Sequence, residues 1–99
     1  MIDTLVQRAD AENIRVLRVN PTGKLSSNSL RLAKVRNATV HAEFGFPGAE
    51  LKTHVGMYPV WIVGEVGMMN ADLVQHIWNH WDALNRRPLL IFEGYLKVR

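Results

Sequence analysis

Hydrophobic residues are densest in the C-terminal part of the chain, residues 59–99. Positions 60–63 are apolar throughout, as in a strand that is covered on both faces of a sheet. Residues 70–85 repeat apolar positions at helical spacing, and residues 89–98 again favour a strand. We therefore predict a strand–helix–strand unit that forms the packing centre of the fold. Its two strands either pair in parallel across a right-handed crossover or have another strand between them.

The predicted helix begins after Asn70, a favourable N-cap, and ends before Pro88. At about 100° per residue, one apolar stripe runs along it, with Trp78 and His80 at its borders and His76 further round. We expect the three tryptophans to join the core between sheet and helix, and any exposed one to mark a binding or dimer surface. The stripe consists of Leu73, Val74, Ile77, Trp81 and Leu84.

The N-terminal part of the chain predicts one short helix and one strand. Residues 3–12 place their apolar side chains on one helical face, and a helix this short must dock on another element. Residues 14–19 are rich in β-branched types and predict a strand. Asn-Pro-Thr-Gly at 20–23 is strong turn chemistry and ends that strand. Residues 25–29 form a polar connection.

The segment 30–55 predicts antiparallel strands. Residues 30–35 fit either a strand or a helical turn, and Arg36-Asn37 fits the tip of a tight hairpin. Residues 38–46 alternate apolar and polar side chains, which predicts a half-buried strand. Residues 50–55 then predict a short strand that returns antiparallel.

These elements define the expected fold class, α+β. We predict a single two-layer domain over residues 1–99, with a mostly antiparallel sheet of five to six short strands. The main helix, about 70–85, packs on one face of the sheet, and a short helix precedes it at the N-terminus. A chain of 99 residues supports one core of this size.

The amino-acid composition excludes several kinds of functional site. The chain has no cysteine, which excludes disulfides, thiol nucleophiles and cysteine-ligated metals and suits a reducing compartment. The N-terminus lacks a signal-peptide pattern, and no apolar run approaches the roughly 18 residues of a membrane span. We therefore expect a cytoplasmic protein without a membrane partner.

The positive charge is unevenly distributed. The net charge is +3, and the sequence pI is about 9.7. Between residues 13 and 42 there are six basic residues and no acidic one. A basic face of this kind binds phosphate groups or an acidic protein surface. The segment lacks the interleaved aromatics of single-strand nucleic-acid readers, since the first aromatic residue is Phe44.

Candidate catalytic chemistry is confined to the helix. His76 and His80 are four residues apart, so their imidazoles can reach one metal ion. A third ligand would have to come from His41, His54, Glu43 or Glu65, and two boundary histidines without metal are the simpler interpretation. The sequence contains no nucleophile elbow, phosphate-binding loop or dinucleotide fingerprint. We therefore expect neither an enzyme nor a cofactor.

Our leading hypothesis is a small non-enzymatic interaction protein that docks on a larger protein or nucleoprotein partner through its basic face. An accessory, adaptor or inhibitor role fits, as in many compact bacterial or viral proteins. The alternatives are a nucleic-acid-binding domain that uses residues 15–36, and a metal-dependent enzyme centred on His76 and His80. An exposed edge strand would also allow a homodimer. The expected contact residues are Arg15, Arg18, Lys24, Arg31, Lys34, Arg36, Met57 and Tyr58.

Overall fold

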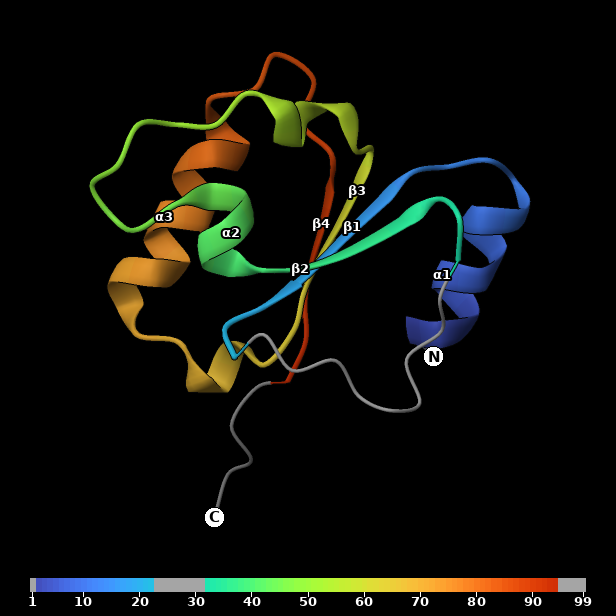
Figure 1. Ribbon diagram of the computed structural model, residues 1–99, viewed down its shortest axis with the longest axis horizontal. Helices are drawn as coiled ribbons and strands as arrows, with labels where there is room; N and C mark the ends of the chain where they lie inside the picture. Colours follow the sequence, from blue (N-terminus) through green and yellow to red (C-terminus); the bar gives the residue numbers. More distant parts are fainter. Residues whose placement is uncertain (1, 23–31, 95–99) are drawn as a thin grey trace.

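A four-stranded parallel sheet forms the centre of the molecule (Figure 1). The computed structural model describes residues 2–22 and 32–94. Neighbouring strands follow the order β2-β1-β3-β4, and every neighbouring pair is parallel. The strands are β1 (Val16–Asn20), β2 (Val35–Thr39), β3 (Val60–Val63) and β4 (Leu89–Phe92).

Helices lie on both sides of this sheet (Figure 1). On one face packs α1 (Ile2–Ala11), and on the other pack α2 (Val40–Phe44) and α3 (Ala71–Asp82). Two single turns of 3₁₀ helix flank β3, namely η1 (His54–Met57) and η2 (Val66–Met68).

The two faces of the sheet support separate apolar clusters. In β1, Val16 packs toward α1 while Leu17 and Val19 pack toward α2 and α3. In β3, Ile62 joins the first cluster, and Trp61 and Val63 join the second. Central strands covered on both faces need apolar residues at successive positions. This explains the continuous apolar run that the sequence shows at 60–63.

The α+β class is retained, but the predicted sheet is wrong. The described residues form four strands, all parallel, instead of five to six that are mostly antiparallel. The two-layer arrangement is also wrong, because α1 covers the face opposite to α2 and α3. The chain passes from each of the first three strands to the next by a crossover instead of a tight hairpin, and a crossover returns the chain in the same direction. Arg36 and Asn37 accordingly lie inside β2 and not at a hairpin tip.

The predicted strand at 38–46 fails for an identifiable reason. An alternating pattern places apolar residues at i and i+4, which is also a helical spacing. The Thr39 hydroxyl accepts a hydrogen bond of 3.0 Å from the Ala42 N–H and caps a helix instead. Val40 and Phe44 are then buried on one helical face, whereas Phe46 is 67% exposed.

Other predicted elements are confirmed. The strand within 14–19 appears as β1, and β3 and β4 pair in parallel, one of the two options for the C-terminal unit. Asn70 caps α3 by accepting a 2.8 Å hydrogen bond from the Leu73 N–H. The predicted strand at 50–55 is wrong, because no strand occurs before β3 in this stretch. The connection at 25–29 and the end of the last strand, 95–98, lie outside the described residues.

We predict that Gly94→Ala destabilises the fold more than Gly48→Ala. Both glycines have positive φ, 78° and 93°, so alanine costs each site about 1–2 kcal/mol of backbone strain. A Cβ at Gly94 would also lie 2.9 Å from backbone atoms of Glu65, whereas nothing lies within 4 Å at Gly48. The overlap should add about 1–3 kcal/mol. Urea unfolding of both variants measures the difference in the free energy of unfolding. Equal losses of stability would refute the close approach of Gly94, after β4, to Glu65, after β3.

A candidate anion-binding pocket

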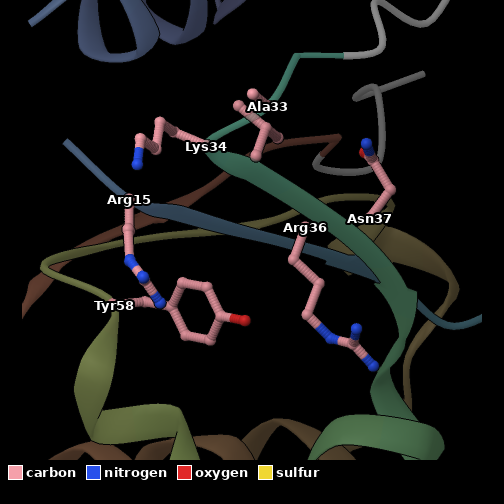
Figure 2. A pocket seen from close by; sticks show the side chains of 7 residues that line it. Arg15, Ala33, Lys34, Arg36, Asn37 and Tyr58 are labelled. Carbon is pink, nitrogen blue, oxygen red and sulfur yellow. The ribbon is translucent and has the colours of Figure 1, made fainter. Parts of the chain in front are cut away.

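A basic pocket of about 410 Å³ opens beside the starts of β1 and β2. Figure 2 shows the basic side chains around this hollow, with the Tyr58 ring between Arg15 and Arg36 in that view. Three of the lining residues are cationic, and Tyr58 contributes a phenolic hydroxyl. We call this hollow the basic pocket; its lining residues are Arg15, Ala33, Lys34, Val35, Arg36, Asn37 and Tyr58.

The parallel pairing of β1 with β2 brings the basic residues together. Val16 is in register with Val35, so the residues just before them, Arg15 and Lys34, are also neighbours. The Val16 N–H donates a hydrogen bond of 2.9 Å to the Lys34 carbonyl. Arg36 lies two positions along from Lys34, and such residues share one side of a strand. The parallel pairing thus brings basic residues from two separate segments of the sequence together in one cationic site.

Arg36 is held by a buried carboxylate. Its Nε donates a hydrogen bond of 2.6 Å to Oε1 of Glu43, which is only 1% exposed. The other carboxylate oxygen of Glu43 lies 3.0 Å from His54 Nε2. The hydrogen bond and charge of Glu43 raise the pKa of Arg36 above its ordinary value. Arg36 is therefore fixed in position and fully charged.

Arg15 and Lys34 carry charges that no carboxylate of the described residues neutralises. Among residues 2–22 and 32–94, neither side chain forms an ion pair. The nearby carboxylate of Asp10 accepts a 2.8 Å hydrogen bond from the Lys34 main-chain N–H, not from its ammonium group. Guanidinium, ammonium and phenol groups are all donors to oxyanions. The basic pocket is thus equipped to bind an anionic group.

The remaining predicted contact residues are divided. Arg18 points to the opposite end of the strands, where its guanidinium lies 3.6 Å from the Glu93 carboxylate. Met57, beside Tyr58, is 50% exposed. Lys24 and Arg31 lie outside the described residues. The six basic residues of the segment therefore do not all share one face.

Sequence reasoning missed the acidic residues that organise the basic pocket. Glu43 is seven residues from Arg36, and a strand over 38–46 would have put its side chain in solvent. Asp10 lies on α1, 24 residues before Lys34, with β1 between them. The Arg36–Glu43 contact depends on the helix α2 that follows β2, which the strand predicted over 38–46 replaced. The Asp10–Lys34 contact joins two elements that are distant in the sequence, and no local spacing signals it.

The histidines of α3 are buried, not at a polar border. His76 and His80 are 5% and 1% exposed. His76 Nε2 lies 2.8 Å from the Phe44 carbonyl, to which it donates. The buried side of α3 is thus rotated toward the histidines relative to the predicted stripe. The hydrogen bond from His76 to the Phe44 carbonyl joins α3 to the end of α2.

His80 uses both ring nitrogens. Its Nε2 accepts a 2.9 Å hydrogen bond from the Lys52 N–H, and its Nδ1 therefore carries the proton and donates to the His76 carbonyl at 3.0 Å. Burial lowers the pKa of His80, so the ring is kept neutral. Neither nitrogen is left for a metal. Within the described part of the chain, no three histidine or acidic side chains are grouped closely enough to hold an ion.

One tryptophan lies outside the core. Trp61 is fully buried, and its Nε1 donates to the Val55 carbonyl at 3.1 Å. Trp78 is 44% exposed and rests on Trp81, with ring centroids 4.9 Å apart. Arg87 covers the Trp81 ring at 5.2 Å. The expectation that all three tryptophans pack between sheet and helix is therefore wrong for Trp78.

Comparison of the chain with protein-family models, curated proteins and solved structures gives no match. Across residues 2–22 and 32–94, no helix combines the length and apolarity needed to cross a bilayer. The arrangement of the basic pocket is accordingly the evidence on which a function can be argued.

We predict that acid destabilises the fold through His80. Its pKa is lower in the folded chain than the ordinary value of 6.5, so below that pH the unfolded chain takes up more protons. The contribution of His80 to the free energy of unfolding is thus fully present above about pH 6.5. It falls on acidification by up to about 1.4 kcal/mol per pH unit. Urea unfolding from pH 8 to pH 5 measures this slope.

The slope should be shallower in His80→Gln and unchanged in His41→Gln, a control at a partly exposed histidine. If the stability of His80→Gln falls with pH as steeply as that of the unsubstituted chain, the neutral hydrogen-bonded ring of His80 is not the cause of the acid destabilisation.

We predict that Arg36→Gln lowers the free energy of unfolding by about 1–3 kcal/mol, because it removes the charged partner of a buried carboxylate. Arg15→Gln, which breaks no ion pair, should change it by less than about 0.5 kcal/mol. In the double variant Arg36→Gln/Glu43→Gln, the loss should be smaller than the sum of the single losses. Denaturant unfolding is measured for the unsubstituted chain, Arg36→Gln, Glu43→Gln, the double variant and Arg15→Gln. Strictly additive losses in the double variant would argue against the coupling of Arg36 with Glu43.

Proposed function

We propose that this chain is a non-enzymatic interaction protein that docks on an acidic site of a larger protein partner through the basic pocket. The observation that carries the proposal is the convergence of Arg15, Lys34 and Arg36 on one hollow. Two of them have no counter-charge in the part of the chain that the structure describes. An accessory, adaptor or inhibitor role follows from docking without chemistry. A cysteine-free composition is compatible with the cytoplasm as the place of action.

A protein partner is favoured over nucleic acid by the shape of the positive surface. Nucleic acids are bound along a track of cations that follows the phosphate backbone. Here Arg8, Arg18 and Arg87 lie elsewhere and are matched with acids, namely Glu12, Glu93 and Asp82. The described cations Lys52 and Arg86 also lie outside the lining of the basic pocket. In the basic pocket, by contrast, three cationic side chains line one hollow.

The border of the basic pocket also suits a protein surface. Met57 is half exposed next to the partly buried Tyr58. Methionine and tyrosine are enriched at protein interfaces, where they add apolar contact around polar anchors. An acidic residue of the partner would enter the hollow while apolar residues cover this border.

The test is affinity capture with the full chain from nuclease-treated cell lysate at moderate salt, with mass spectrometry of the retained proteins. We expect one protein to be retained stoichiometrically by the unsubstituted chain and to be lost with Arg15→Gln/Lys34→Gln. The charge-matched control is Arg8→Gln/Arg87→Gln, which also removes two positive charges but acts at exposed ion pairs away from the basic pocket. This control should retain the partner.

Failure to retain any protein, or equal retention by both double variants, would refute the proposal. Retention that occurs only from lysate without nuclease treatment, together with a mobility shift of free nucleic acid that weakens steeply with salt, would instead establish the nucleic-acid alternative.

A further inference from the structure

We propose that the basic pocket binds a phosphate monoester, carried on a phosphorylated side chain of the partner. This inference rests on the proposed docking function and specifies the chemical group recognised. A phosphate monoester has a charge of about −1.5 to −2 at neutral pH and three terminal acceptor oxygens. A carboxylate or a phosphodiester has a single negative charge.

The charge of the basic pocket matches a dianion. Arg15, Lys34 and Arg36 line the hollow, and Glu43 neutralises one of them by its bond to Arg36. Two positive charges are left without a partner among the described residues. A monoanion would leave one of these uncompensated, whereas a monoester balances both. The Glu43 carboxylate does not line the hollow and so does not face the bound anion.

The donors are also positioned before any ligand arrives. Glu43 binds Nε of Arg36, so the terminal nitrogens of the same guanidinium are left for the anion. Asp10 fixes the main chain at Lys34 through the 2.8 Å bond to its N–H. Donors held in place by a surrounding shell lose less entropy on binding. These two carboxylates therefore position the Arg36 guanidinium and the main chain from which the Lys34 side chain extends.

The volume points to a group larger than a free ion. A hollow of about 410 Å³ lies within the usual range of about 300–1,000 Å³ for sites that take small organic molecules. It therefore has room for the phosphate together with the side chain that bears it. The Tyr58 ring forms part of the wall (Figure 2) and offers a surface for that side chain.

The experiment is an NMR titration of the ¹⁵N-labelled full chain with four short peptides that differ at one residue. They carry phosphoserine, phosphotyrosine, sulfotyrosine or glutamate. Sulfotyrosine has the same tetrahedral shape as phosphotyrosine but one negative charge. We expect a phosphopeptide to shift the amide signals of residues 33–37 and to bind about tenfold more tightly than the sulfated and glutamate peptides, as expected for one charged contact.

Arg15→Gln and Lys34→Gln should each weaken the phosphopeptide about tenfold, and Arg8→Gln should leave its affinity within twofold. Which of the two phosphopeptides binds more tightly identifies the type of side chain. Equal affinity for the phosphorylated and sulfated peptides, or shifts confined to other residues, would overturn the inference. Tighter binding of a nucleoside 5′-monophosphate than of both phosphopeptides would overturn the assignment to a protein side chain.

Phosphatase treatment of the lysate separates this inference from the proposed function. If the captured partner is lost after treatment, both stand. If it is still captured and still depends on Arg15 and Lys34, the docking function holds and recognition of a phosphate monoester is refuted.

Discussion

The buried carboxylate of Glu43 is the interaction on which the basic pocket depends. At 1% exposure it must be paired, because an isolated charge in the interior costs several kcal/mol. Its two oxygens contact Arg36 from β2 and His54 from η1, while Glu43 itself lies on α2. One side chain thus links three consecutive elements on one face of the sheet. The same bond fixes Arg36 at the wall of the basic pocket, so fold and site share this contact.

The parallel sheet places the other cations. In a parallel sheet the amino ends of all strands lie at the same end of the sheet. Arg15 and Lys34 therefore become neighbours although they are far apart in the sequence. The Arg18 side chain points toward the carboxyl end of β4 and contacts Glu93 there. A charge-rich segment that looks uniform in the sequence is thereby divided between the two ends of the sheet. At the amino end, a hollow that could hold an anion is lined by Arg15 and Lys34, which form no ion pair among residues 2–22 and 32–94.

The sequence was sufficient for elements whose pattern is unambiguous. The apolar run at 60–63, the capped helix after Asn70 and the β-branched strand before Asn20 are all present in the structure. The sequence was insufficient where one pattern of apolar residues fits both the strand and the helix period, as at Val40 and Phe44. It was also insufficient where the direction of a strand depends on a long connection. A single sequence does not reveal whether a connection is a hairpin or a crossover when its residues suit both. Four of the eight predicted contact residues line the basic pocket, but the carboxylates that position them were missed.

The histidine pair illustrates why spacing alone does not define chemistry. Four residues apart on a helix, two imidazoles can share a metal, but they can equally share the task of satisfying buried backbone groups. In α3 the rings accept from or donate to main-chain groups of Lys52, Phe44 and His76. Those bonds satisfy polar groups that would otherwise be buried without partners. These ring nitrogens are therefore used within the fold. The charged groups of Arg15 and Lys34, in contrast, form no ion pair among residues 2–22 and 32–94, and this contrast supports the proposed role of the basic pocket.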